Sequence, residues 1–312
     1  MVKIQSNIEN FRATWPVLTM GMFDGVHKGH QELLTRLVQA ARDRGGESVV
    51  LTFWPHPRIV LGQDPGKLRF LTTLDEKTRL ISEVGVDHIL VLSFTRQVAE
   101  LSAEAFIRNY LVGKMGIHQL LVGYNHRFGH GGISSESLHQ LAAAHGFDLT
   151  FCEPVSVDGM KPSSTTIRQF IADGDVWEAA RLLGRFYGVK GQIIGGQKLG
   201  RQIGFPTANV APEDPKKLIP HDGVYACRVH LLGKTYGGMI NVGQRPTVKN
   251  NTYQKTLEVH IFDFNREVYS EEIAVEFIKR TRPEIKFRGI DALKARLQKD
   301  AGEIKEILEN LE

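Results

Sequence analysis

The decapeptide G-M-F-D-G-V-H-K-G-H occupies residues 21–30 and organises the first half of the chain. Apolar residues gather just before it, at 15–20, and recur at helical spacing after it, at 33–41. This pattern predicts a buried strand, a glycine turn and a helix. Such a turn directs the free N–H groups of the first helical turn at a ligand above the end of the strand, and phosphate suits these donors.

Two imidazoles lie in this turn, at His27 and His30. Because they are three residues apart, we expect both in the first turn of the helix, on the same side. For the pair alone, surface histidines that follow Asp24 as the helix N-cap are an equally good interpretation. Glycines at 21, 25 and 29 leave room for a ligand to approach the backbone.

Polar loops also follow other predicted strands of the first half. Apolar runs at 48–53 and 119–123 are typical of strands buried on both faces, and the loops after them contain His56 and Asn125. The alternation of such strands with helical stretches predicts a parallel sheet covered by helices, with ligands at the carboxyl ends of the strands. Hydroxyls at 163–166 either cap a helix or hold phosphate oxygens.

The decapeptide resembles the H-x-G-H signature of nucleotidyltransferases, in the form found in bacterial bifunctional riboflavin kinase/FAD synthetases (FMN adenylyltransferases). T-F-W-P-H-P at 52–57 is similar to the second motif of that family. G-Y-N-H-R-F-G at 123–129 and K-P-S-S-T-T-I-R at 161–168 are similar to its later motifs, with departures at His126 and Pro162. The resemblance implies a Rossmann-like nucleotidyltransferase domain.

The resemblance also implies how this domain acts: histidines and basic groups stabilise charge on the α-phosphate of ATP while pyrophosphate leaves. The implied catalytic residues are His27 and His30. The implied ligands of ATP and its phosphates are Gly21, Phe23, Asp24, Gly25, Asn125, Arg127, Ser163, Ser164, Thr165 and Arg168. The implied flavin contacts are Phe53, Pro55 and His56.

Length and composition indicate a globular protein of two domains. The chain has 312 residues, of which 42% are hydrophobic and 24% charged. Its two cysteines, Cys152 and Cys227, indicate a reducing compartment rather than a disulfide framework. The amino terminus lacks the apolar core of a signal peptide, and no apolar run approaches the ~18 residues that span a membrane, so a cytoplasmic protein without membrane association is expected.

Charge separates the two halves. Lys and Arg number 18 against 19 Asp and Glu in residues 1–184, and 21 against 16 in residues 185–312. The basic residues of the second half are scattered, without a basic run, so small phosphorylated ligands are favoured and nucleic-acid binding is not expected. Self-association is left open.

The pattern changes near residue 186 to short β-rich segments separated by glycine. Strands are expected at 189–196, 224–232, 234–242, 256–263 and 272–280. They suggest a small antiparallel barrel, followed by one helix at 291–311. We therefore predict two domains, 1–185 with an α/β fold and 186–312 with the barrel and its C-terminal helix.

The string K-L-G-R-Q-I-G-F-P-T-A-N at 198–209 carries the chemistry of the second half. Thr207 and Asn209 place two oxygen-bearing side chains on one side of an extended segment, which suits Mg²⁺ with nucleotide phosphates. For T-A-N alone, a polar edge strand is the simpler interpretation. The whole string resembles the flavokinase motif of the same family, which implies that the ATP and flavin ligands are Gly200, Gly204, Phe205, Pro206, Thr207 and Asn209, with Thr207 and Asn209 holding the metal.

The resemblance further implies that Glu267 is the base for the ribityl hydroxyl of riboflavin, although Val268 and Ser270 depart from the family pattern. A carboxylate near a phosphate can accept that proton. The main hypothesis is an Mg²⁺-dependent enzyme that converts riboflavin and ATP to FMN in its second half, and FMN and ATP to FAD in its first. The alternatives are an enzyme with kinase activity alone and a flavin-binding or RNA-binding module without turnover.

Overall fold

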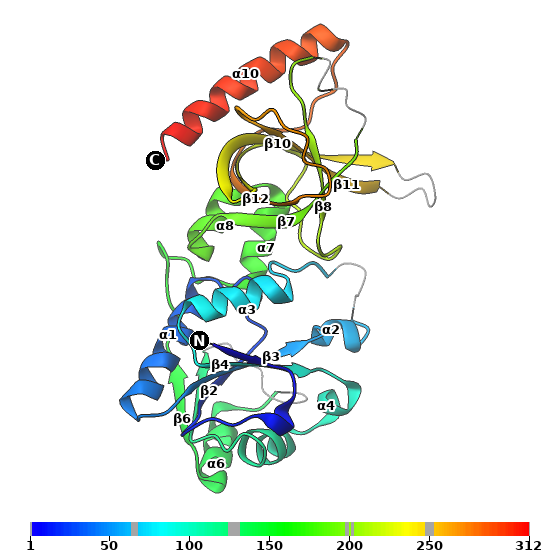
Figure 1. The fold of residues 1–312 in the computed structure, drawn as a ribbon. Coiled ribbons are helices and arrows are strands. Elements are labelled where there is room, and N and C mark those ends of the chain that lie inside the picture. The colour runs from blue at the N-terminus through cyan, green and yellow to red at the C-terminus, as the bar shows by residue number, and fades with distance from the viewer. Residues whose placement is uncertain are drawn as a thin grey trace. The chain divides into compact units, whose positions relative to one another are not determined.

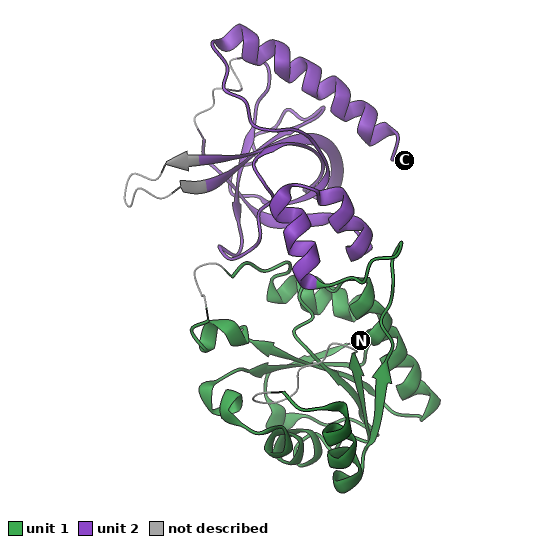
Figure 2. Cartoon of the chain, turned by 180° about the vertical axis from the view of Figure 1, so that it is seen from behind, with its two compact units in different colours: residues 1–163 green, residues 164–312 purple. Residues whose placement is uncertain are grey.

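The computed structural model describes residues 2–63, 68–123, 132–196, 200, 203–246 and 253–311. The chain divides into two compact units, Met1–Ser163 and Ser164–Glu312 (Figure 2). The position of one unit relative to the other is not determined.

The first unit is built on a six-stranded sheet with strand order β1-β4-β3-β2-β5-β6 (Figure 1). Every neighbouring pair of strands is parallel, as the sequence predicts. The strands are β1 (Lys3–Gln5), β2 (Val17–Met20), β3 (Ser48–Trp54), β4 (His88–Ser93), β5 (Gln119–Gly123) and β6 (Asp148–Cys152). The long apolar strands β3 and β4 are buried along almost their whole length, which is the environment that apolar runs favour.

Helices cover both faces of this sheet (Figure 1). They are α1 (Lys28–Asp43), α2 (Pro57–Val60), α3 (Leu74–Glu83), α4 (Arg96–Glu100), α5 (Ala103–Phe106), a π-helical segment (Ile107–Val112), α6 (Ser135–His145) and a 3₁₀ turn (Ile8–Asn10). Successive side chains of β3 point to opposite faces. Val49 and Leu51 share a core with α5 and α6, whereas Val50 shares the other core with α1 and α3.

Strand β2 is the point at which the order of the sheet changes direction. β3 and β4 extend the sheet on one side of β2, and β5 and β6 extend it on the other. In open α/β sheets, ligands bind at such a switch point, beyond the carboxyl ends of the strands. The decapeptide at 21–30 starts directly after Met20, the last residue of β2, so the fold places it at the switch point.

The second unit is a closed antiparallel barrel with strand order β10-β11-β8-β7-β12-β9 (Figure 1). The predicted barrel is therefore confirmed. Two helices precede it, α7 (Ser164–Asp173) and α8 (Val176–Leu183). The strands are β7 (Tyr187–Ile194), β8 (Ala208–Pro212), β9 (Gly223–Leu231), β10 (Lys234–Pro246), β11 (Tyr253–Ile261) and β12 (Glu272–Arg282), and the helix α10 (Ile290–Glu309) follows them.

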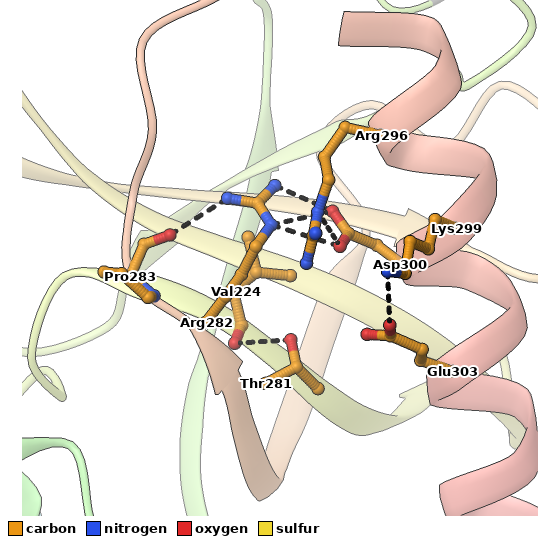
Figure 3. A network of polar contacts seen from close by, with 8 residues as sticks. All are labelled: Val224, Thr281, Arg282, Pro283, Arg296, Lys299, Asp300 and Glu303. Carbon is orange, nitrogen blue, oxygen red and sulfur yellow. Dashed lines mark hydrogen bonds and ion pairs between the residues drawn. The ribbon is translucent and has the colours of Figure 1, made fainter.

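Helix α10 is attached to the barrel by apolar packing and by a buried carboxylate. Ile304 packs with Val224 of β9 in one core. Asp300 is fully buried and accepts hydrogen bonds from Arg282, at the end of β12, and from Arg296, one turn earlier in α10 (Figure 3). The predicted C-terminal helix is therefore confirmed. Apolar packing and the hydrogen bonds of Asp300 together hold it on the barrel.

Helices α7 and α8 pack against each other, and α8 contacts β7 and β12. They therefore belong to the second compact unit, which begins at Ser164. The domain boundary that the sequence predicts between residues 185 and 186 stays a prediction.

Candidate active sites

The loop after β2 has a strained backbone. Phe23 and Val26 have positive φ angles of 48° and 38°, on either side of Gly25 at 84°. A left-handed conformation is unfavourable for a β-branched residue such as Val26 and persists only where the surroundings enforce it. Both side chains are buried in the core between the sheet and α1, which holds the loop in place.

Polar contacts fix the same loop. The Asp24 carboxylate accepts hydrogen bonds from the backbone N–H of Leu71 and of Thr72, both at 3.0 Å, and the Gly25 N–H donates to the Thr72 hydroxyl at 3.0 Å. Asp24 therefore links the loop to the segment before α3. It is not the N-cap of α1, a role that belongs to His27.

The two histidines are arranged differently from the prediction that both lie in the first helical turn. His27 precedes the helix as its N-cap, and its Nδ1 accepts the backbone N–H of His30 at 3.3 Å. The two rings stack with their centroids 3.6 Å apart and their planes 16° from parallel. Because Nδ1 of His27 is an acceptor, the proton of the neutral ring lies on Nε2.

His30 is held neutral. Its Nδ1 is buried and has no hydrogen-bond partner among the residues that the structure describes. The pKa of His30 lies well below its usual value, first because burial disfavours the imidazolium and then because His27 and Lys77 are nearby. A neutral imidazole at His30 thus lies next to the start of α1, where the free N–H groups of the first turn favour an anion.

A cavity of about 40 Å³ adjoins both histidines. Its walls come from α1, from the ends of β5 and β6, and from the chain after β6; they include Arg36, Gly123, Cys152 and Pro162. The cavity thus lies at the carboxyl edge of the sheet, beside the switch point, as predicted for a ligand of a parallel sheet.

Other residues implied for this site either do not line the cavity or lie outside the described residues. Gly21 donates its N–H to the carbonyl of Leu51 at 3.1 Å, and Phe53 is buried against the rings of Phe94 and Phe106. Pro55 follows a cis peptide bond, and His56 caps α2 with its ring stacked on Phe70 at 5.9 Å. Asn125 and Arg127, with their neighbour His126, lie outside the described residues.

The hydroxyl-rich string spans the boundary between the units. Ser163 ends the first unit, whereas Ser164, Thr165 and Arg168 lie in α7 of the second unit. The prediction that they join His27 and His30 around one ligand therefore stays a prediction.

Sequence reasoning missed Lys77 on α3. Its side chain is only 3% exposed, and its ammonium donates to the Met22 carbonyl and to the Thr52 hydroxyl, each at 3.2 Å. The available signal was a charged residue on the apolar face that Leu74 and Ile81 define, at helical spacing from both.

The second unit has a larger cavity, of about 290 Å³. Thr207 and Glu267 both line it, although they lie sixty positions apart in the sequence; their assigned roles stay predictions. Pro206 and Tyr269 contribute further walls. Asn209 lies farther along β8, and Gly196 leaves room for its amide, because a Cβ at Gly196 would come within 2.1 Å of Nδ2.

The G-F-P-T segment is folded tightly beside this cavity. The Phe205 N–H donates to the Gly200 carbonyl at 2.8 Å, and a Cβ at Gly200 would come within 2.2 Å of the Phe205 carbonyl oxygen. Gly204 has a φ of 86°, which suits glycine. The Pro206 carbonyl pairs with Nδ1 of His260 at 2.8 Å, and burial lowers the pKa of His260.

Two negative findings apply to the described residues. Among them, no group of three or more His, Cys, Asp or Glu side chains forms a metal-binding cluster. No helix in these same ranges combines the length and the apolar character needed to cross a membrane.

Comparison with known proteins matches two successive parts of the chain to two different family models. A family model described as FAD synthetase matches residues 12–166, and one described as riboflavin kinase matches residues 183–308. A bifunctional riboflavin kinase/FMN adenylyltransferase of Listeria monocytogenes is 38% identical over 296 residues, which are 95% of this chain and 93% of that protein. The protein of the same description from Escherichia coli K12 is 40% identical over 286 residues, 91% of this chain and 90% of its own length.

A solved structure shows the same fold over the whole chain. A crystal structure described as a macrolide-efflux protein from Streptococcus pneumoniae superposes with a TM-score of 0.89 at 32% identity, covering 98% of this chain and 99% of that one. Together, the two consecutive family models and relatives that align almost end to end show that this chain belongs to the bifunctional riboflavin kinase/FMN adenylyltransferase family.

Proposed function

We propose that the barrel unit phosphorylates riboflavin with ATP to give FMN, and that the α/β unit transfers the adenylyl group of a second ATP to FMN, giving FAD and pyrophosphate. The observation that carries this proposal is the presence of two separate cavities, each beside the reactive residues of a different motif: His27 and His30 at one, Thr207 and Glu267 at the other. The order of the two family models supports the same division.

In the adenylyl-transfer site, the FMN phosphate attacks the α-phosphorus of ATP in line with the leaving pyrophosphate. One P–O bond forms as another breaks, without a covalent enzyme intermediate. His27 donates its Nε2 proton to an α-phosphate oxygen, since its Nδ1 is engaged with the helix start. Preorganised donors of this kind act on the charge that develops in the transition state.

The remaining residues of this site are assigned to binding. Gly21, Phe23, Asp24 and Gly25 form the fixed loop that presents the start of α1. We assign Asn125, Arg127, Ser163, Ser164, Thr165 and Arg168 to the nucleotide, and Phe53, Pro55 and His56 to the flavin, on the family resemblance of their motifs.

In the kinase site, Glu267 accepts the proton of the ribityl hydroxyl as that oxygen attacks the γ-phosphorus of ATP and the bond from that phosphorus to the leaving ADP breaks. Both residues proposed to hold Mg²⁺ offer hard oxygen donors, the hydroxyl of Thr207 and the amide of Asn209, and this set fits a magnesium ion that also binds phosphates. When bound, the ion neutralises charge on the phosphate oxygens. Gly200, Gly204, Phe205 and Pro206 shape the loop that carries Thr207 to the cavity.

One incubation tests the proposal. Purified protein with riboflavin, ATP and Mg²⁺ is expected to accumulate FMN first and FAD later, as separated by chromatography of the flavins. FMN without FAD contradicts the adenylyl-transfer assignment, and the absence of any flavin nucleotide at every protein concentration contradicts both. We also propose a reducing, cytoplasmic setting for the protein, which two free and buried cysteines support.

A further inference from the structure

Lys77 is a buried cation of the first unit that joins the loop after β2 to strand β3. Its ammonium contacts the Met22 carbonyl, in the loop after β2, and the Thr52 hydroxyl, near the end of β3. It also lies 5.8 Å from the centroid of the Trp54 ring, within reach of a cation–π contact. Thr52 and Trp54 belong to β3, and Met22 follows the adjacent strand β2 at the switch point of the sheet.

Neither packing nor helix formation explains a cation at this position. An apolar side chain of similar length would fill the space between α3 and the sheet without the cost of removing an ammonium from water. Helix α3 already begins with a complete capping box formed by Thr73 and Glu76. Burial lowers the pKa of Lys77 to about 8, although the charge of Asp24 opposes this shift. A departure from core composition of this kind is expected at a functional site.

The hydrogen bond from Lys77 to the Met22 carbonyl helps to hold the strained loop after β2 in place. Side-chain contacts that hold this loop include the bond of Lys77 to the carbonyl of Met22, the bonds of Asp24 to the segment before α3, and the Gln31 amide, which donates to the Val26 carbonyl at 2.8 Å. The left-handed residues Phe23 and Val26 lie between these attachments. The loop leads directly to His27, so its geometry determines where the two imidazoles stand.

Lys77 also brings positive charge to the histidines. Its charge contributes to the low pKa of His30, together with burial and His27. The other titratable groups that face the cavity are Glu32, Arg36, Cys152 and Glu153. A cation behind the histidines favours the binding of a polyanion and disfavours the imidazolium form of His30.

We propose that Lys77 is a positioning residue of the adenylyl-transfer site, whose ammonium fixes the Met22 carbonyl and supplies positive charge behind His27 and His30. This proposal rests on the adenylyl-transfer function proposed above. Lys77 acts through the loop and through His30, and is not assigned a contact with the substrate.

Kinetics of purified full-length variants test this role. In Lys77→Met, we expect kcat for FAD formation from FMN and ATP to fall by at least about tenfold, because displaced donors lose their alignment with the transition state. KM for ATP and FMN is expected to change by less than about threefold. FMN formation from riboflavin, in the other unit, is expected to stay within about twofold, since its chemistry depends on separate residues.

The control is Arg79→Met, which removes a cation from the same helix. Arg79 is exposed and pairs with Glu83 on the surface. This variant is expected to leave both reactions and their pH profiles unchanged. Lys77→Gln separates position from charge, because its amide can still donate to the Met22 carbonyl; it is expected to retain more activity than Lys77→Met.

The electrostatic effect of the Lys77 charge is measured through the pKa of His30. Removing the charge of Lys77 should raise the pKa of His30, seen by NMR of folded Lys77→Gln and Lys77→Met, and should move the acid limb of the FAD-formation profile to higher pH. If Lys77→Met does not fold, the His30 titration and the pH profile of Lys77→Gln test the proposal. An unchanged His30 titration and pH profile in the folded neutral variant, or a loss of rate only in proportion to the unfolded fraction, overturns the proposal. Wild-type protein that never forms FAD overturns the proposed function instead.

Discussion

The carboxylate of Asp300, in α10, accepts two hydrogen bonds on one oxygen from the guanidinium of Arg282, at the end of β12 (Figure 3): Nε lies at 2.9 Å from Oδ2 and Nη2 at 2.7 Å. Asp300 is fully buried, and Arg296 donates to its other oxygen at 2.8 Å. A carboxylate in this position compensates two guanidinium groups. The polar part of the attachment of α10 to the barrel therefore depends on one acidic side chain, beside the apolar packing of the helix.

We predict that Asp300→Ala lowers the free energy of unfolding of the barrel unit by about 3–5 kcal/mol, because it leaves the buried charge of Arg282 without a partner. The control lies on the same helix: Lys299 and Glu303 form an exposed pair at 3.8 Å, and Glu303→Gln should cost less than about 0.5 kcal/mol. Denaturant unfolding followed through the barrel unit measures both. Equal effects of the two substitutions would contradict the importance of the buried network.

The two reactions should be separable by mutation. We predict that His27→Asn lowers the rate of FAD formation by at least about 10²-fold while FMN formation is retained, because asparagine preserves an N-cap but cannot supply the Nε2 proton to the α-phosphate. His30→Ala should behave in the same way. Glu267→Gln should do the reverse, abolishing FMN formation but leaving FAD formation intact when FMN is supplied. A single substitution that stops both reactions would show that the sites are not independent.

Much of the fold is predictable because burial leaves a strong trace in the sequence. Strands buried on both faces must be apolar, and the runs at 48–53 and 119–123 match β3 and β5 within one residue. Strand β1 leaves no such trace, because Lys3–Gln5 pairs only with β4 at an edge and its residues are largely exposed. Its existence depends on a distant strand, which no local pattern reports.

The site is predictable in its residue types but not in its contacts. The motif identifies His27 and His30, yet their positions at the start of α1 follow from the strained loop before them, which a spacing rule for a regular helix does not describe. Lys77 was missed because its partners, Met22 and Thr52, lie 55 and 25 residues away in the sequence. Tertiary contacts of this range have no signature in a single sequence.

The kinase reaction should depend on a metal held by Thr207. Chelation of divalent cations with EDTA is expected to stop FMN formation, and added Mg²⁺ should restore it. Thr207→Val is expected to raise the Mg²⁺ concentration needed for half-maximal FMN formation by at least about tenfold, whereas Thr207→Ser keeps the hydroxyl and should stay close to wild type. FMN formation that persists in EDTA, or equal behaviour of the two variants, would contradict a magnesium ligand at this position.

The buried ammonium of Lys77 should make the stability of the first unit depend on alkaline pH. Its pKa is about 8 in the folded protein against an ordinary value of 10.5, so between these values the unfolded chain binds more protons than the folded chain. The contribution of Lys77 to the free energy of unfolding therefore rises with pH across that window, by up to about 3 kcal/mol. Below it, both states carry the charge and the folded state bears its full desolvation cost.

The predicted increase of stability with pH is tested by comparison with Lys77→Met, which lacks the titrating group. The free energy of unfolding of wild type minus that of the variant, measured by hydrogen exchange of β2 and β3, should increase from pH 8 to 10.5 and be flat below pH 7. Arg79→Met gives the baseline for the loss of an exposed cation from α3. The rate of FAD formation should fall as stability rises over the same window, because both changes follow from the loss of one proton. A difference that stays flat across the window would contradict a buried charged lysine at this site.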